Sequence, residues 1–431
     1  MNVANLGGAL APLGREATNS SSTVQSNQLA NIFICDPVCV QGLGHNLAAV
    51  NRYSDYLSLH GISTTAYVSK LLANSSALRM PKQTRPVYSH YYAKTISVAN
   101  AENDSSTASI LATEPPDVEA LIHKIALQEL EQILSEVAEP QTTGIFYPSI
   151  DYYSFRALVH FLEENSDKFL PTLFVRWIGV MENCRYGFSN DFSLTQLCAR
   201  LSQVITRCPH LRIYHSTECD TYSEKMSQLL NVHVASTPSL FVEELLPFPS
   251  NASFTICFPG SARIDKGFNR IPHILSLLDS RYPSLDYRVY LQLLPAHELV
   301  HHYNIVRDVL KNCRVKCYPS HVSKEVLSLY IAASSILVAP YCNRIYELRS
   351  SAIMAEGACF GRQIVSSTGC GFSNELSSLG LGVCCKDDYE VADSIYHYSQ
   401  LSQTEMIDIT NSARSNYHGY ANRAYANFFK F

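Results

Sequence analysis

Two cationic side chains, Arg263 and Lys266, follow a glycine turn in the segment FPGSARIDKGFNR, which begins at Phe258. An apolar, strand-like run precedes them and a stretch with helical apolar spacing follows. Gly260 permits a tight turn. Arginine offers a planar fork to phosphate and lysine a mobile charge, so the pair suits a diphosphate. An isolated R-x-x-K is more often a pair of surface charges, but the turn after a strand and Gly267 at the helix start favour an anion site.

A second candidate segment runs from residue 338 to residue 367, VAPYCNRIYELRSSAIMAEGACFGRQIVSS. It predicts a buried strand, a polar loop, a helix that begins near Ser350, and another strand. Ser350 or Ser351 would cap the helix, whose first-turn N–H groups form an anion site. Glu356 lies about one and a half turns inside, where it could accept hydrogen bonds from a ribose diol. A surface acid is the alternative, but its apolar neighbours favour a partly enclosed position.

Together the two segments resemble motifs of GT-B glycosyltransferases, especially the retaining enzymes of glycosyltransferase family four. PGSARIDKG is similar to their phosphate-binding G-x-x-R-x-x-K-G element, and RSSAIMAEGACFGRQIV is similar to their nucleotide-binding helix. The resemblance covers about the C-terminal 180 residues. It implies that Arg263 and Lys266 hold the donor diphosphate, that Ser350 and Ser351 supply backbone donors, and that Glu356 holds the ribose.

The sequence departs from the family pattern just before this helix. The first of two glutamates in the family would fall at Leu348, and Glu347 is one position out of register. We interpret the Y-x-x-R-S-S sequence here as subgroup variation and count Tyr346 and Arg349, with Gly260, among the donor-binding residues. The role of the family's first glutamate stays unassigned.

The N-terminal half offers weaker candidates for the acceptor side. Gly42, Gly44 and His45 form a loop after the first apolar run, and we expect this loop to face the acceptor. His45 is a candidate catalytic residue, with an ordinary loop histidine as the equal alternative. Asp36 and Asp151 are alternative acids for the same place.

The elements that position these residues alternate between strand-like and helix-like segments. This predicts an α/β protein of two doubly wound, Rossmann-like domains that face each other across a cleft, the GT-B architecture. We expect four parts: a flexible tail over 1–28, an acceptor domain over 29–245, a donor domain over 250–403, and a helical segment over 404–431 that packs back on the first domain. The expected linker lies around 243–251, and residues 74–116 give little signal.

Composition limits the other classes of function. The chain has 431 residues, of which 46% are hydrophobic and 16% charged, so two packed domains are expected. A net charge of −5 gives no general attraction to nucleic acid. The 14 cysteines form no CxxC pair, so we predict no metal site from them. Without a signal-like start or a long apolar run, we expect a cytoplasmic protein without a transmembrane segment and leave peripheral membrane contact open.

These observations predict transfer of a sugar from a nucleotide-sugar to a hydroxyl acceptor, which is a glycan, a lipid-linked molecule or a small molecule. Arg263 and Lys266 would act catalytically by neutralising the leaving diphosphate, without a metal or a further cofactor. Retention at the anomeric carbon is implied by the resemblance, and polysaccharide or surface-glycan synthesis is the expected context. The alternatives are a GT-B-shaped epimerase or phosphorylase, and a binding or scaffold protein without turnover.

Overall fold

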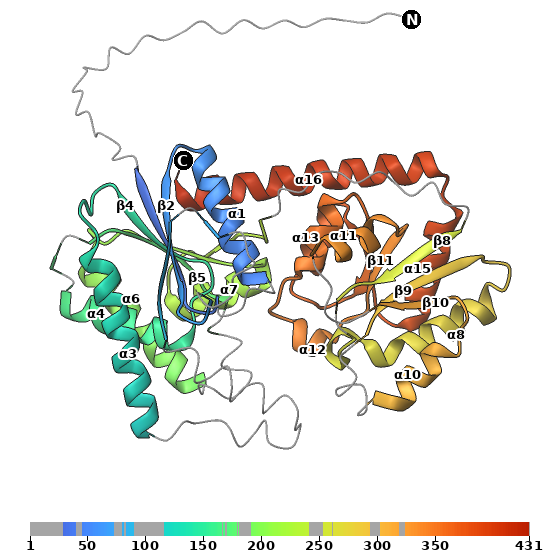
Figure 1. The fold of residues 1–431 in the computed structure, drawn as a ribbon, viewed down its shortest axis with the longest axis horizontal. Helices are drawn as coiled ribbons and strands as arrows, with labels where there is room; N and C mark the ends of the chain where they lie inside the picture. The colour runs from blue at the N-terminus through green and yellow to red at the C-terminus, as the bar shows by residue number, and fades with distance from the viewer. Residues whose placement is uncertain are drawn as a thin grey trace, which may run out of the picture.

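The computed structural model of the chain describes residues 29–39, 45–72, 80–81, 83–89, 116–165, 167–168, 170–178, 180, 191–240, 253–260, 262–293, 302–318 and 324–430. These residues form two parallel sheets, each packed with helices (Figure 1). This confirms the predicted α/β class and the two Rossmann-like domains. None of the described helices is both long and apolar enough to span a membrane.

The first domain is built on a seven-stranded sheet with the order β3-β2-β1-β4-β5-β6-β7, in which every pairing is parallel. Its central strands are buried on both faces, as parallel sheets require. The order reverses between β1 and β4, so the loops that follow these two strands diverge at the carboxyl edge. The strands are β1 (Asn31–Asp36), β2 (Ser63–Ser69), β3 (Thr84–Tyr88), β4 (Thr143–Tyr147), β5 (Thr172–Arg176), β6 (Ile213–Thr217) and β7 (Ala235–Ser236). The helices are α1 (His45–Leu59), α3 (Pro116–Ser135), α4 (Tyr152–Asn165), α6 (Asp191–Arg207) and α7 (Asp220–Leu230).

The second domain has a six-stranded parallel sheet with the order β10-β9-β8-β11-β12-β13. Here the order reverses between β8 and β11, and the two candidate segments follow these very strands. The strands are β8 (Phe254–Phe258), β9 (Tyr287–Gln292), β10 (Val315–Tyr318), β11 (Ile336–Ala339), β12 (Gln363–Ser367) and β13 (Gly382–Cys385). The helices are α8 (Ile271–Arg281), α10 (Tyr303–Leu310), α11 (Lys324–Ala332), α12 (Asn343–Tyr346), α13 (Ala352–Cys359), α14 (Ser373–Ser378) and α15 (Asp388–Gln400).

One long helix, α16 (Gln403–Phe429), runs along both domains (Figure 1). It begins with a capping box formed by Ser402 and Glu405, which satisfies the free N–H groups of its first turn. Near its start Met406 packs in the core of the second domain. Near its end Phe428 and Phe429 pack in a core of the first domain, together with residues of β1 and α1.

Two strands were not predicted from the sequence. Strand β3 lies in the stretch that gave little signal, and β13 is the short edge strand GVCC. Within the apolar run NVHVAST, residues 231–237, only the two-residue strand β7 forms. The predicted tail over 1–28 and the predicted linker around 243–251 lie outside the described residues.

Candidate active site

The loop after β8 folds tightly around its lysine. A short 3-10 turn, η2 (Ile264–Lys266), is closed by hydrogen bonds from the Lys266 N–H to the Arg263 carbonyl at 3.1 Å and from the Gly267 N–H to the Ile264 carbonyl at 2.9 Å. Gly260 has φ +85°, and a Cβ atom placed on it would lie 2.8 Å from the Lys266 Nζ. The lysine ammonium therefore lies directly against the glycine turn.

The charge of Lys266 has little compensation. Burial and, to a smaller extent, the neighbouring Arg263 charge lower the pKa of Lys266 to about 8, whereas Asp265 and Glu356 act in the opposite direction. Within the described residues the ammonium group makes no hydrogen bond or ion pair. A half-buried ammonium of this kind is stabilised by a bound anion, because the anion offsets the cost of burial.

Arg263 is already engaged by a neighbouring acid. Its Nε donates to Asp265 Oδ1 at 2.8 Å and its Nη2 donates to Asp265 Oδ2 at 2.6 Å, so the guanidinium fork is filled. The arginine side chain is 41% exposed and the aspartate 12%, which leaves the pair accessible from one side. A phosphate at this loop would share the guanidinium with Asp265, a partner that the sequence interpretation did not consider.

The loop after β8 is fastened to the loop after β11. Gly267 has φ +79°, and a Cβ atom on it would lie 1.9 Å from the Pro340 carbonyl oxygen, so no larger residue fits. The Cys342 N–H donates to the Asp265 carbonyl at 2.9 Å. Arg270 donates to the Pro340 carbonyl at 3.0 Å. These contacts bring the two predicted segments together.

The second segment forms the predicted helix, α13, with Ser351 at its N-cap in an extended conformation. The Ser351 side chain makes no capping bond but hydrogen-bonds Tyr341, whose pKa burial raises to about 12. The Ser350 N–H donates to Glu218 Oε2 of the first domain at 3.3 Å. The start of α13 thus faces an anionic group, which in this structure is a carboxylate of the protein itself.

Glu356 is only 6% exposed, which confirms the enclosed position expected for it. It lies close enough to Lys266 to raise the pKa of that ammonium. Arg349 lies with its guanidinium carbon 5.8 Å from the centre of the Tyr346 ring, a cation–π arrangement. The structure therefore places the seven other predicted donor residues in the adjoining segments that follow β8 and β11, up to the start of α13, with Glu356 inside that helix.

Leu348 explains the departure from the family pattern. This side chain is 8% exposed and packs in the apolar cluster of the first domain, with Trp177 among its members. A glutamate here would bury a carboxylate among apolar groups, at a cost of several kcal/mol by order of magnitude. The position serves contact between the domains instead.

The candidate acids of the first domain have different surroundings. Burial raises the pKa of Asp36 to about 7, against a hydrogen bond at 3.1 Å from the Val38 N–H to Asp36 Oδ1. Asp151 accepts hydrogen bonds from the Tyr153 N–H at 2.9 Å and the Ser154 N–H at 3.2 Å, which are the bonds of a cap for α4. Its other oxygen accepts from the Ser154 hydroxyl at 2.6 Å.

The glycine loop of the first domain is only partly visible in the structure. Gly42 and Gly44 lie outside the described residues, and His45 is the first residue of α1, with its side chain not described. Within the described part of the chain, no group of three or more His, Cys, Asp or Glu side chains is arranged to hold a metal ion.

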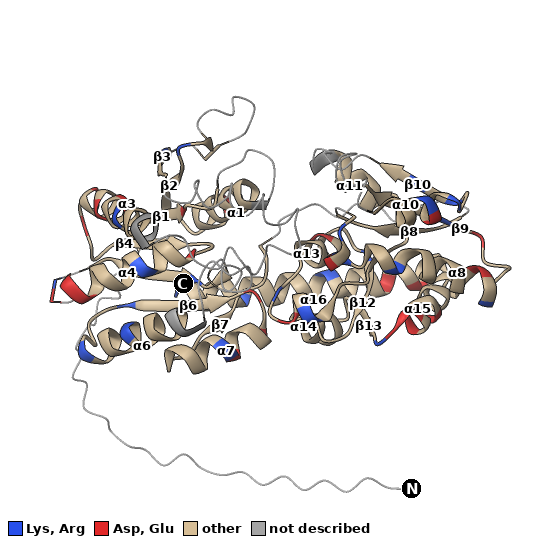
Figure 2. Ribbon diagram, turned by 90° about the horizontal axis from the view of Figure 1, so that it is seen from below, with Lys and Arg blue, Asp and Glu red and all other residues tan. Residues whose placement is uncertain are grey.

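Two carboxylates connect the domains, and sequence reasoning missed both. Besides the contact of Glu218 with α13, Glu375 of α14 accepts a hydrogen bond at 3.0 Å from the Asp220 N–H at the start of α7. Figure 2 shows α7 on the side of the first domain that faces α14 of the second. Each acid therefore meets the N-terminus of a helix in the other domain. Burial raises the pKa of Glu375 to about 7, with the Asp220 charge adding to the increase.

No protein-family model matches the chain, and no curated protein sequence matches it. Solved structures do resemble it over almost its whole length. The UDP-forming α,α-trehalose-phosphate synthase of Burkholderia xenovorans superposes with a TM-score of 0.62 at 12% identity, covering 94% of this chain and 99% of that one. The E. coli trehalose-6-phosphate structure with bound UDP-2-fluoro glucose has a TM-score of 0.60 at 12% identity, over 93% and 99%. The sucrose-phosphate synthase of Thermosynechococcus elongatus has a TM-score of 0.59 at 11% identity, over 90% and 94%. The chain has the GT-B fold.

In this GT-B chain the donor candidates were found because each occupies a contiguous segment after a strand. The sequence could also have indicated that Asp265 pairs with Arg263, since Asp265 is the one acid between the two cations. The partners Glu218 and Ser350 are 132 residues apart, and no local pattern connects them.

Proposed function

We propose that the chain is a glycosyltransferase that moves a sugar from a nucleotide-sugar to a hydroxyl acceptor. The observation that carries the proposal is the Lys266 ammonium, which lies against Gly260 at the reversal point of the second sheet without a hydrogen bond or ion pair among the described residues. Ligands of doubly wound sheets bind at this place. Three solved structures with the same fold are, by their names, sugar-phosphate synthases or hold a UDP-sugar analogue, which supports the assignment.

In the proposed reaction the charge that develops on the departing nucleoside diphosphate is stabilised by the protein. Lys266 supplies an ammonium group and Arg263 shares its guanidinium with the phosphate. The Ser350 N–H, now bonded to Glu218, would turn to the phosphate, and Glu356 would hold the ribose. Binding without a metal and retention at the anomeric carbon belong to this proposal, the second through the resemblance to family four.

For the acceptor we propose a glycan or another hydroxyl compound bound on the first domain, near the loop that contains His45. Polysaccharide or surface-glycan synthesis as the context, and the cytoplasm as the compartment, are part of the same proposal. The names of the similar structures favour uridine as the first base to test.

Thermal unfolding with a panel of nucleoside diphosphates and their sugars tests the donor site. A ligand at a hundred times its Kd stabilises by about 2.7 kcal/mol, which is about 5–10 °C for a domain of this size. The double variant Arg263→Ala/Lys266→Ala should lose the shift. A control pair at the end of α10, Arg307→Ala/Lys311→Ala, removes two exposed cations of the same domain and should keep it. If no nucleotide stabilises the intact chain, the donor site is refuted.

A nucleotide-sugar-binding protein without turnover is the second candidate. Two observations favour it: Leu348 stands where the family has a glutamate, and Asp265 fills the Arg263 fork. Release of nucleoside diphosphate from the bound sugar donor, with and without hydroxyl acceptors, distinguishes the two. Binding without any release would favour the second candidate.

A further inference from the structure

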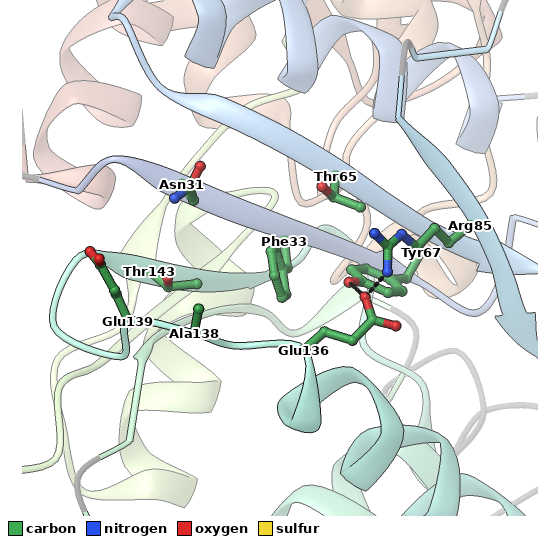
Figure 3. A pocket seen from close by; sticks show the side chains of 9 residues that line it. All are labelled: Asn31, Phe33, Thr65, Tyr67, Arg85, Glu136, Ala138, Glu139 and Thr143. Carbon is green, nitrogen blue, oxygen red and sulfur yellow. Dashed lines mark hydrogen bonds and ion pairs between the residues drawn. The ribbon is translucent and has the colours of Figure 1, made fainter.

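A cavity of about 540 Å³ lies at the amino edge of the first sheet (Figure 3). Its walls include Asn31 and Thr143, the first residues of β1 and β4, and the loop that follows α3. Nucleotide and acceptor sites of doubly wound sheets lie at the carboxyl edge, so this cavity belongs to neither. It shares no residue with the candidate active site.

The cavity exists because α3 ends at Ser135, before the amino ends of the strands. Where α3 still covers the sheet, its residue Ile133 packs in the core with Tyr67 and Ile145. Beyond the helix end Phe33 is left half-buried, and its ring lies 5.2 Å from the ring of Tyr67 at a tilt of 53°. Phe33 and Tyr67 therefore form an aromatic surface of the sheet that faces the cavity. A longer α3 would have covered this surface with a further core residue.

Polar groups surround this aromatic surface. Glu136 accepts a hydrogen bond from the Tyr67 hydroxyl at 2.6 Å and forms an ion pair with Arg85 of β3 (Figure 3). Glu139 accepts a hydrogen bond from the Thr142 hydroxyl at 3.1 Å and is exposed at the rim. Asn31 is exposed at the same rim and offers a donor and an acceptor on one side chain.

The balance of charge and polarity defines the class of ligand. Arg85 neutralises Glu136, which leaves Glu139 as the uncompensated charge, so a phosphate or another anion is disfavoured. An apolar ligand is disfavoured because carboxylate, amide and hydroxyl groups make up most of the lining. A saccharide combines an apolar C–H face with a rim of hydroxyl groups that both donate and accept. The volume lies within the range of about 300–1,000 Å³ that is usual for small-molecule sites.

We propose that this cavity is a second saccharide site, which binds a neutral sugar against Phe33 with Asn31 and Glu139 on its hydroxyl groups. In a glycosyltransferase such a site would hold a distant unit of a long acceptor. The site itself does not depend on that activity, since its residues and those of the donor site are separate.

Saturation-transfer NMR and calorimetry on the full chain, with glucose, galactose, maltose, cellobiose, trehalose and maltohexaose, test the proposal. We expect at least one of these saccharides to bind, and the double variant Asn31→Ala/Glu139→Ala to weaken it about tenfold or more. Both side chains are exposed, so the Tm of the variant should not change. The milder variant Phe33→Leu keeps an apolar side chain and should reduce the signal from the sugar C–H protons.

The donor-site double variant Arg263→Ala/Lys266→Ala and saturating UDP are the controls, and neither should alter saccharide binding. The proposal is overturned if no saccharide of the panel binds, if binding survives Asn31→Ala/Glu139→Ala, or if UDP displaces the sugar. If the donor-site variant loses UDP binding but still binds the saccharide, the result supports two separate sites.

Discussion

Binding of UDP to the chain should weaken as the pH rises from 7 to 9, if Lys266 holds the diphosphate. Burial lowers the pKa of Lys266 to about 8, from the usual 10.5. The ammonium form therefore loses its proton within this range, whereas an exposed lysine would keep it. The UDP phosphates are ionised throughout, because the second pKa of a phosphate group is about 6.

The expected size of the effect follows from the pKa. With a value of about 8, roughly nine-tenths of the Lys266 side chains carry a charge at pH 7 and roughly one-tenth at pH 9. A diphosphate beside the ammonium raises its pKa in the complex, so binding selects the charged form. The affinity should then fall about tenfold, which corresponds to about 1.4 kcal/mol.

Titration calorimetry with UDP at pH 7, 8 and 9 measures this fall. In Lys266→Arg the side chain stays charged, so the affinity should be nearly constant over the range. In Lys266→Met the affinity should be low and constant. Lys311 is exposed and pairs with Asp308 at 3.0 Å, so Lys311→Met should keep the affinity and the pH profile of the wild type. A flat profile in the wild type, or an unchanged slope in Lys266→Arg, would refute the reasoning.

Three further outcomes are expected. Gly267→Ala should lower the Tm by about 9 °C, because the clash and the backbone strain cost about 3 kcal/mol. Gly380 has φ +68° but open space around it, so Gly380→Ala should lower the Tm by only about 3 °C. Equal shifts of the Tm by calorimetry would contradict the contact of Gly267 with a backbone carbonyl. Burial raises the pKa of Glu375 from 4.5 to about 7, so its contribution to stability is present below pH 4.5 and lost as the pH rises through 7. Glu375→Gln should make this decline in urea midpoints, measured between pH 4.5 and 8, smaller, and Asp36, whose pKa burial also raises to about 7, accounts for part of the rest. An unchanged decline would rule out a contribution from Glu375. Phe429→Ala should cost about 3–5 kcal/mol by urea unfolding, against less than about 0.5 for Leu59→Ala, which is 80% exposed; similar losses would show that α16 adds little to the first domain.

The central strands could be predicted because burial on both faces requires continuous apolar runs. FTICF and SILVAP are runs of this kind, and β8 and β11 form there. Edge strands carry less of this signal. Strand β3 contains Pro86 and buries only its last two residues, and β13 is half-buried over three of its four residues.

The donor candidates could be predicted because their chemistry is contained in short segments that follow strands. Their electrostatic partners are set by tertiary structure instead. The contact between Glu375 and Asp220 joins residues 155 positions apart, and the pKa of Glu375 depends on burial that exists only once both domains are packed together. The cavity at the amino edge likewise depends on where α3 ends relative to the strands, which a periodic sequence pattern does not specify to the residue.

The magnitudes indicate which contacts set the relative position of the two domains. The contact of Glu218 with the start of α13 is worth about 1 kcal/mol, the usual value for a carboxylate at a helix N-terminus, and the contact of Glu375 contributes less at neutral pH because burial disfavours its charged form. Helix α16 contributes more, because Tyr425, Phe428 and Phe429 are buried in the first domain at about 1.5–3 kcal/mol each. The Tyr425 hydroxyl also donates to a backbone carbonyl just before the connection between the domains, at 2.6 Å. Helix α16 therefore contributes most to how the domains sit, and under the proposed function the weaker contact of Glu218 is the one that a phosphate at the start of α13 would replace.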